Sequence, residues 1–363
     1  MCYQTVKTLK IICGISNSTS EEDIKAYVEA GVDEFFIGYI PKEWSNVYGW
    51  EVSCNRREHS NYHYYDAEEL EEVVNFIHKY HKKVFLTLNA HEYNNQQIKL
   101  ILGILNDIRH IPIDAFIVSN IAMMLELRNN GFDIPMNISI GGGSNSFESI
   151  EFYESVVENI GRYVLPRKLT MKEIEDIAKK SAERNIKLEA FGMADPCIFN
   201  DEYCFTWHGA SNKSFCQSPM YTHKEATPLV FDNTWKEDIT NKDISYFFEK
   251  RFEKESKIKQ QRFQYTSRKP KVKHGPQEIK KLHILGKIDK CGLCAFQKFK
   301  EWGIEAIKLP LRGSHISTNL SLIELSKKIM QQPDATPKYC QKVLNSPNFC
   351  SGDNCFYNYP YSN

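Results

Sequence analysis

Several common features are missing from this chain of 363 residues, and each absence excludes a class of protein. No apolar run approaches the roughly 18 to 20 residues of a membrane span, and Met1 is not followed by a basic and then apolar leader. With 18 glycines, 14 prolines and a normal 42% of hydrophobic residues, a collagenous or wholly disordered chain is excluded. Because 46 basic side chains balance 46 acidic ones, net charge gives no reason to expect nucleic acid. We therefore expect a soluble, cytoplasmic, globular protein.

Familiar catalytic motifs are missing as well. His91 and His208 stand in no His-Glu-x-x-His arrangement, which leaves a zinc metalloprotease without support. There is no Gly-x-Ser-x-Gly turn, and no Cys–His pair stands out by position, so a peptidase has no visible nucleophile and base. Gly141-Gly142-Gly143 lacks the dinucleotide fingerprint; it is either a flexible turn or a place where backbone amides approach an anion.

What is present is a repeated alternation of apolar strands and amphipathic helices. Ser20, followed by acidic residues, is typical of a helix N-terminus, and Gly31 suits a left-handed helix end. The pattern predicts strands at 9–14, 35–40, 84–89, 115–119, 136–140, 162–165, 187–191 and 305–309. Helices are expected between them, at 68–80, 97–108, 122–129, 147–159, 172–184 and 296–302. Eight such units predict an α/β fold, a (β/α)8 TIM-like barrel whose functional residues follow the strands.

Two segments do not fit a plain barrel. We expect a barrel domain over 1–313, interrupted before the last βα unit by an inserted basic segment at 217–281. Its part 248–281 holds twelve Lys/Arg against four Asp/Glu, interleaved with aromatics. That composition suits RNA or another anionic partner, but a solvated amphipathic helix with a mobile loop is the favoured interpretation. Residues 314–363 are expected to form a cysteine-containing C-terminal extension, a helix plus an irregular cap.

Eleven cysteines in a cytoplasmic chain point to metal or cluster ligands rather than a disulfide framework. Cys197, Cys204 and Cys216 follow the seventh predicted strand, and Cys291 and Cys294 precede the last barrel helix. Loops at one barrel face can bring these thiols together, as an iron–sulfur cluster or tetrahedral zinc requires. The spacing matches neither a zinc finger nor a ferredoxin.

The other cysteines have simpler interpretations. Cys2 and Cys13 are expected to be ordinary thiols. Cys340, Cys350 and Cys355 could hold a second metal, although ordinary thiols are favoured because no fourth ligand is obvious.

Cationic side chains also follow the predicted strands. They could converge into a pocket for a carboxylate or phosphate, or form salt bridges with loop residues such as Glu51 and Glu58. Asn89, at the end of the third strand, could bind substrate or cap a turn. The candidate cations are Arg56, Arg57, Arg167, Lys308 and Arg312.

In their order and spacing, these elements resemble the collagenase-like peptidase family of the U thirty-two type, which includes ubiquinone and RNA hydroxylation proteins. The resemblance covers most of residues 9–312. It rests on Ala30-Gly-Val-Asp33, Arg56-Arg57, Val84-Phe-Leu-Thr-Leu-Asn89, Val164-Leu-Pro-Arg167, Glu189-Ala-Phe-Gly-Met-Ala-Asp-Pro-Cys197 and Asp289-Lys-Cys291.

The resemblance implies a 4Fe-4S cluster held by Cys197, Cys204, Cys216 and Cys291. It also implies oxygen-independent hydroxylation, with prephenate as cosubstrate in the RNA branch. The chain departs from the family: Met193-Ala194 replaces a His-Gly, Met220 replaces a cysteine, and the final motif changes around Pro310. Cys54 resembles an early ligand of one branch, so Cys54 and Cys294 are alternate ligands.

Three functions follow from these observations. The first is an iron–sulfur-dependent enzyme related to hydroxylation proteins, acting on a small molecule or RNA. The second is a peptidase of the named family. The third is a non-catalytic, metal-stabilised binding subunit that works with a protein partner, with zinc as the alternative metal.

Overall fold

The computed structural model describes residues 9–49, 54–57, 62–193, 197, 201–204, 291–311, 315–344 and 355–357. All of them belong to one unit of the chain, made from Met1–Ser218 and Lys280–Asn363. The predicted basic segment at 217–281 lies outside these ranges, so the domain division stays a prediction.

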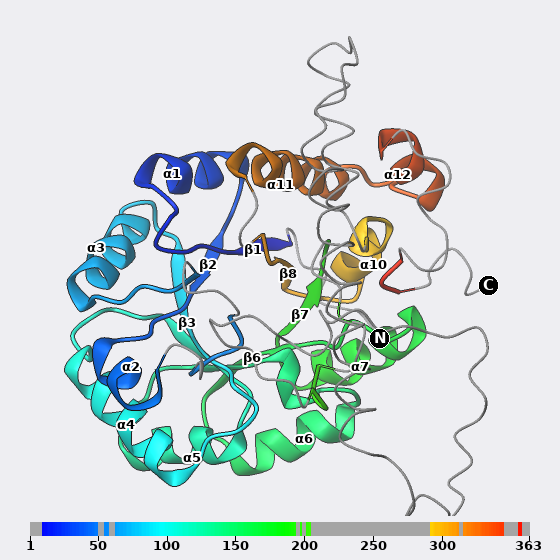
Figure 1. The fold of residues 1–363 in the computed structure, drawn as a ribbon. Helices are drawn as coiled ribbons and strands as arrows, with labels where there is room; N and C mark the ends of the chain where they lie inside the picture. The colour runs from blue at the N-terminus through cyan, green and yellow to red at the C-terminus, as the bar shows by residue number, and fades with distance from the viewer. Residues whose placement is uncertain are drawn as a thin grey trace, which may run out of the picture. The chain divides into compact units, whose positions relative to one another are not determined.

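The described residues form a closed barrel of eight parallel strands, with the helices arranged around it (Figure 1). Each strand pairs with the next along the chain, and β8 pairs with β1 in the register Ile12↔Lys308 to close the barrel. This confirms the predicted TIM-like fold. The strands are β1 Lys10–Gly14, β2 Glu34–Ile37, β3 Lys83–Leu88, β4 Ala115–Val118, β5 Met136–Ile138, β6 Ile160–Val164, β7 Leu188–Phe191 and β8 Ala306–Leu309.

Helices follow the strands because the intervening segments carry apolar faces and N-capping residues. Ser20 accepts a hydrogen bond from the Asp23 amide at 3.1 Å, and Gly31 ends the helix at φ 106°, as expected. The helices are α1 Glu21–Ala30, α2 Lys42–Tyr48, α3 Ala67–His78, α4 Asn95–Asp107, α5 Ile121–Asn129, α6 Phe147–Val156, α7 Met171–Glu183, α10 Phe296–Glu301, α11 Ile316–Met330 and α12 Pro337–Leu344. Short 3-10 turns occur at Ile140–Gly142 (η2) and Leu293–Ala295 (η4).

The described part of the chain after β8 contains two helices, α11 and α12, where the sequence suggested one helix and a cap. The first packs against α1, beside which it lies in Figure 1. Asn319 donates to the Tyr27 hydroxyl at 2.8 Å, and Lys327 donates to the Gly31 carbonyl at 3.2 Å. Helix α11 therefore serves as a member of the ring that covers the barrel.

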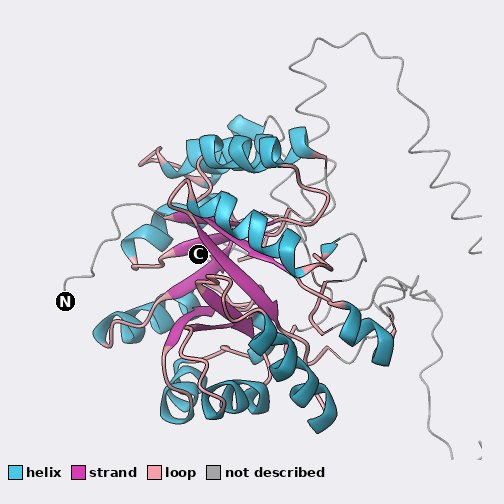
Figure 2. Cartoon of the chain, turned by 90° about the vertical axis from the view of Figure 1, so that its left-hand side faces the viewer, coloured by secondary structure: helices cyan, strands magenta, loops and turns pink. Residues whose placement is uncertain are grey.

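Apolar side chains fill two regions. The larger core lies between the strands and the surrounding helices, which Figure 2 shows on either side of the strands. A smaller cluster has side chains from four strands and packs in the barrel interior. Its members are Ile12, Phe36, Phe85, Ala115 and Ile117.

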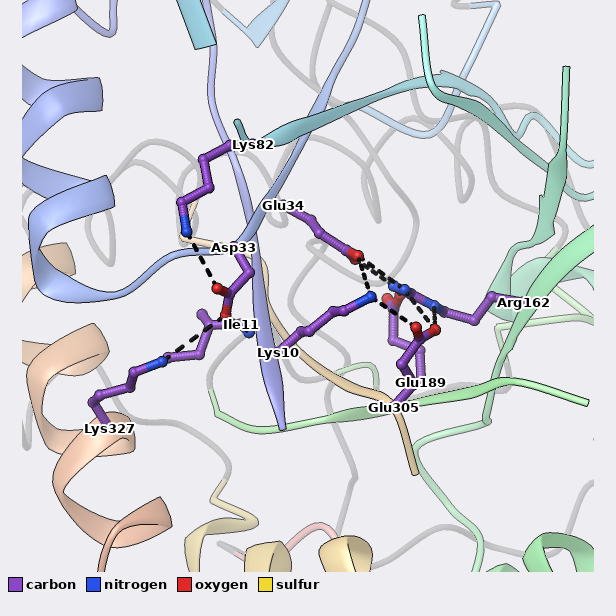
Figure 3. Close-up of polar contacts among 9 residues, drawn as sticks. All are labelled: Lys10, Ile11, Asp33, Glu34, Lys82, Arg162, Glu189, Glu305 and Lys327. Carbon is purple, nitrogen blue, oxygen red and sulfur yellow. Dashed lines mark hydrogen bonds and ion pairs between the residues drawn. The ribbon is translucent and has the colours of Figure 1, made fainter. Parts of the chain in front are cut away.

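The amino end of the barrel is closed by charge pairing (Figure 3). Arg162 lies 3.0 and 2.5 Å from the two carboxylate oxygens of Glu34, 3.1 Å from Glu189 and 2.8 Å from Glu305. Lys10 lies 2.7 Å from Glu305 and 3.3 Å from Glu34. We call these five residues the basal cluster. Because it links strands from opposite parts of the sequence, it ties the barrel closed.

Candidate functional site

The carboxyl end of the barrel gathers polar side chains from several strand–helix connections. Arg56 follows β2 and α2, Asn89 follows β3, Arg167 follows β6 and Asp201 follows β7. This is the end at which barrels of this type carry their functional residues.

Two arginines meet at one carboxylate. The Nη2 atoms of Arg56 and Arg167 each donate to the same Oδ1 atom of Asp201, both at 3.3 Å. All three are nearly buried: the arginine side chains are 10% exposed and that of Asp201 is 5% exposed. Among the described residues, the group thus combines two cations with one anion. We call Arg56 and Arg167 the arginine pair.

Local contacts fix the orientation of both arginines. The Arg167 guanidinium lies 4.3 Å from the ring centroid of Phe191, the last residue of β7, so the ring supports it by a cation–π contact. The Arg56 amide donates to the Asn89 side-chain oxygen at 3.1 Å, and Asn89 in turn donates to Ser139 at 3.3 Å. Asn89 thus holds the backbone of the loop that presents Arg56, whichever further role it has.

Two other predicted cations are engaged elsewhere. Arg57 is 1% exposed and donates to the backbone carbonyls of Ile15 and Phe36, which ties its loop to the ends of β1 and β2. Lys308 lies in β8, where it pairs with Glu189 at 3.0 Å and sits 4.3 Å from the Phe36 ring centroid. Arg312 lies outside the described residues.

The triple glycine forms a turn. The amide of Gly142 donates to the Ser139 carbonyl at 2.8 Å, and that of Gly143 donates to the Ile140 carbonyl at 3.3 Å. Gly143 has φ 74°, and its position faces Glu202. Since these two amides are already paired, the structure favours the turn over an anion site.

Among the candidate ligands, Cys54 is a buried thiol. Its Sγ donates to the Tyr39 carbonyl at 3.2 Å, and burial raises the pKa of the thiol to about 12. Its role as an alternate ligand of the predicted cluster stays a prediction.

The remaining candidate thiols lie on two connections at the carboxyl end. Cys197 and Cys204 flank Asp201 along the chain after β7 and are partly exposed. Cys291 is bridged through its backbone to Met193, just beyond β7, and Cys294 lies in η4; both are buried. Soft thiol donors on neighbouring connections suit a cluster or zinc chemically.

The described residues do not by themselves complete a metal site. Within the described ranges, no three His, Cys, Asp or Glu side chains gather as metal ligands, and Cys216 lies outside those ranges. The ligand set Cys197, Cys204, Cys216 and Cys291 therefore stays a prediction, as do the 4Fe-4S and zinc assignments.

The C-terminal tail adds an unpredicted contact beside these thiols. Cys355 forms a backbone bridge with Cys291, and Phe356 donates to the Cys291 carbonyl at 3.0 Å. Tyr357 donates its hydroxyl to the Phe191 carbonyl at 2.7 Å. The tail thus supports the end of β7 from which Phe191 contacts Arg167.

Sequence reasoning missed Asp201. The available signal was its position: an acidic side chain between two predicted cluster cysteines, on the connection after a barrel strand. Its contact with Arg56 spans 145 residues, so no local pattern could reveal it.

The geometry defines this chain as a TIM-like barrel protein with polar side chains gathered at the carboxyl end of the barrel. Comparison with known families identifies the family: residues 19–339 match Peptidase family U32, and the chain belongs to that family. No helix in the described part of the chain is long and apolar enough to cross a membrane.

Individual relatives are distant and longer. The chain is 28% identical over 159 residues to "Uncharacterized protease MJ0090" of Methanocaldococcus jannaschii, covering 42% of this chain and 38% of that protein. It is 22% identical over 128 residues to tRNA hydroxylation protein P of Escherichia coli (35% and 28% covered). It is 25% identical over 204 residues to tRNA hydroxylation protein P1 of Bacillus subtilis (54% and 43%). The chain therefore spans less than half of the length of each.

Among solved structures, the U32 peptidase Mk0906 aligns with a TM-score of 0.36 at 12% identity, covering 58% of this chain and 81% of that one.

Proposed function

We propose that this chain is an iron–sulfur-dependent enzyme that hydroxylates RNA or a small molecule without using molecular oxygen. One observation carries the proposal: the segment that presents Cys197 and Cys204 is bound through Asp201 to the arginine pair at the carboxyl end of the barrel. Two predicted cluster ligands therefore lie on the connection that contacts the arginine pair. Membership of the family, and relatives named tRNA hydroxylation proteins, support the same chemistry.

In this proposal each group has a separate task. Cys197, Cys204, Cys216 and Cys291 would hold the cluster, which supplies redox chemistry when bound. Arg56 and Arg167 bind the carboxylate of a cosubstrate such as prephenate, because two guanidiniums in a largely buried site pair strongly with an anion. Phe191 and Asn89 orient that pair. Acting on RNA would place the chain in the cytoplasm, with the basic segment 248–281 as a candidate RNA contact.

Metal analysis after anaerobic purification tests the cluster. We expect iron and acid-labile sulfide in the wild-type chain and their loss in Cys204→Ala. Cys13→Ala is the matched control, because Cys13 is buried within β1 and is not a predicted ligand. Zinc alone, or iron retained in Cys204→Ala, would contradict the proposal.

A peptidase is the second candidate, favoured by the family name and by the relative called a protease. Among the described residues, the Ser317 hydroxyl lies 2.9 Å from His315 Nδ1, but both side chains are exposed, and His315 is the N-cap of α11, where it accepts a hydrogen bond from the Ser317 amide. The contact has no described third group that orients the imidazole as a base. Hydrolysis of a mixed peptide library by the purified chain, retained after removal of the metal, would favour this candidate over the hydroxylase.

A binding subunit is the remaining alternative. An activity assay would distinguish it from the enzyme. A binding subunit would retain iron and bind RNA, but hydroxylated product would form only after a protein partner is added.

A further inference from the structure

The hydrogen-bond ladder between β6 and β7 ends on a residue of the C-terminal tail. The Glu189 carbonyl accepts the Leu165 amide at 2.8 Å, and the carbonyl of Lys187, two residues earlier, is paired with β6 in the same way. At the next position of this two-residue series, the carbonyl of Phe191 accepts the hydroxyl of Tyr357 at 2.7 Å. Tyr357 therefore caps the ladder on the carbonyl that ends β7.

The capped carbonyl belongs to the residue that supports Arg167. Arg167 follows Leu165 by two residues, so it continues the same series on the side of β6. Its guanidinium lies 4.3 Å from the centroid of the Phe191 ring. Whatever fixes the backbone of Phe191 consequently also fixes the aromatic ring on which this arginine lies.

Tyr357 is itself held by elements outside the arginine site. Its side chain is buried, and its ring meets that of Phe299 in α10 edge to face, with centroids 5.3 Å apart. A Cβ at Gly292, just before η4, would lie 2.7 Å from Tyr357 Cε2, so the tyrosine ring packs directly on the backbone there. The neighbouring Phe356 ring lies 6.0 Å from that of Phe191. The hydroxyl is therefore placed by α10 and η4.

We propose that Tyr357 is a positioning residue of the arginine pair: through the Phe191 carbonyl, its hydroxyl sets the place of the ring that orients the Arg167 guanidinium. The inference rests on the proposed function for the use of the pair as a carboxylate site, and it adds the C-terminal tail to that site. Because the strand pairing of the barrel remains when the hydroxyl is lost, its removal should change anion binding more than the fold.

Calorimetric titration of the full chain with malonate, a small dicarboxylate, tests the effect on binding. Tyr357→Phe removes the hydroxyl and keeps the ring, and it should weaken malonate binding about fivefold, the effect of one buried hydrogen bond. Tyr163→Phe is the matched control, because its buried hydroxyl donates to Glu154 of α6 at 2.7 Å, and affinity should change by less than about twofold. Unchanged affinity in Tyr357→Phe, or an equal loss in Tyr163→Phe, would overturn the proposal.

The NMR signal of the Arg167 Nε–H group reports the positioning without a ligand. A guanidinium over an aromatic ring lies in the ring current, which moves this resonance to lower frequency. We would assign the signal by its loss in Arg167→Lys. Tyr357→Phe should move it toward the frequency of arginines in water, whereas Tyr163→Phe should leave it in place. A signal that does not move in Tyr357→Phe would overturn the proposal, even if that variant is less stable.

These measurements separate the inference from the proposed function. Absence of iron or of hydroxylated product would defeat the proposed function and leave both measurements interpretable. A wild-type chain that does not bind malonate would defeat the carboxylate site, and the NMR signal would then decide whether Tyr357 positions Arg167.

Discussion

The two ends of the barrel handle buried charge in opposite ways. At the amino end, Arg162 is surrounded by three glutamates, and Lys10 and Lys308 pair with those same carboxylates. At the carboxyl end, two arginines share one oxygen of Asp201. Among the described contacts, three cations meet three anions at the amino end, whereas two arginines meet one carboxylate at the carboxyl end. The same residue types thus hold the barrel together at one end and form a candidate binding site at the other.

Removal of Arg162 should have the largest effect. Arg162→Met leaves Glu34 and Glu189 buried with too few positive partners, and loss of one member of a buried ionic network typically costs about 3–5 kcal/mol. Urea unfolding followed by circular dichroism would measure the free energy of unfolding. A loss below about 1 kcal/mol, the range of exposed pairs, would show that the basal cluster does not hold the barrel closed.

The second-largest effect is expected from acid, which should weaken the charge pairing of the basal cluster. Burial raises the pKa of Glu189, but Lys308 and Arg162 outweigh it and leave the pKa below its ordinary value; Glu305 behaves likewise beside Arg162 and Lys10. Groups with a lowered native pKa bind more protons when unfolded. Their contribution is therefore present above the ordinary glutamate pKa of about 4.3 and is lost as pH falls below it.

Thermal unfolding between neutral pH and pH 3 would measure this dependence. The wild-type chain should lose stability steeply below the glutamate range, and Arg162→Met should show a shallower slope because its glutamates lose their main partner. Equal slopes would contradict the assignment of acid sensitivity to the basal cluster.

An exposed ion pair should have the smallest effect. Lys180 lies 2.9 Å from Glu148 on the surface, where both side chains are more than half exposed. Lys180→Met should leave the unfolding transition unchanged within error, because solvent and salt screen such pairs. A loss comparable to that of Arg162→Met would remove the distinction between balanced buried charge and surface charge.

Local signals in the sequence were enough to predict the strands. All eight were expected within a few residues of their observed bounds, because each is a short apolar run after a helix with recognisable ends such as Ser20 and Gly31. Helix α2 was missed: it has seven residues and begins after Pro41, too short for an apolar period to show.

Pairings that depend on barrel closure could not be predicted in the same way. Arg162 and Glu34 are separated by 128 residues, and nothing near either one indicates the other. The arginines of the carboxyl end were predicted as a group because each follows a strand. Sequence position could not show that Arg57 would bind backbone carbonyls, or that Lys308 would join Glu189.

The central claim is that the arginine pair is there for binding rather than for stability, and Arg167→Gln tests it most directly. Malonate affinity and unfolding free energy should be measured on the same preparation, with the exposed Arg184→Gln as the charge-matched control. We predict at least about a tenfold loss of affinity, equivalent to about 1.4 kcal/mol of binding free energy. The loss of unfolding free energy should be smaller than that of Arg162→Met, because Asp201 keeps its contact with Arg56. Unchanged malonate affinity together with a loss of stability like that of Arg162→Met would show that both ends of the barrel serve the fold alone.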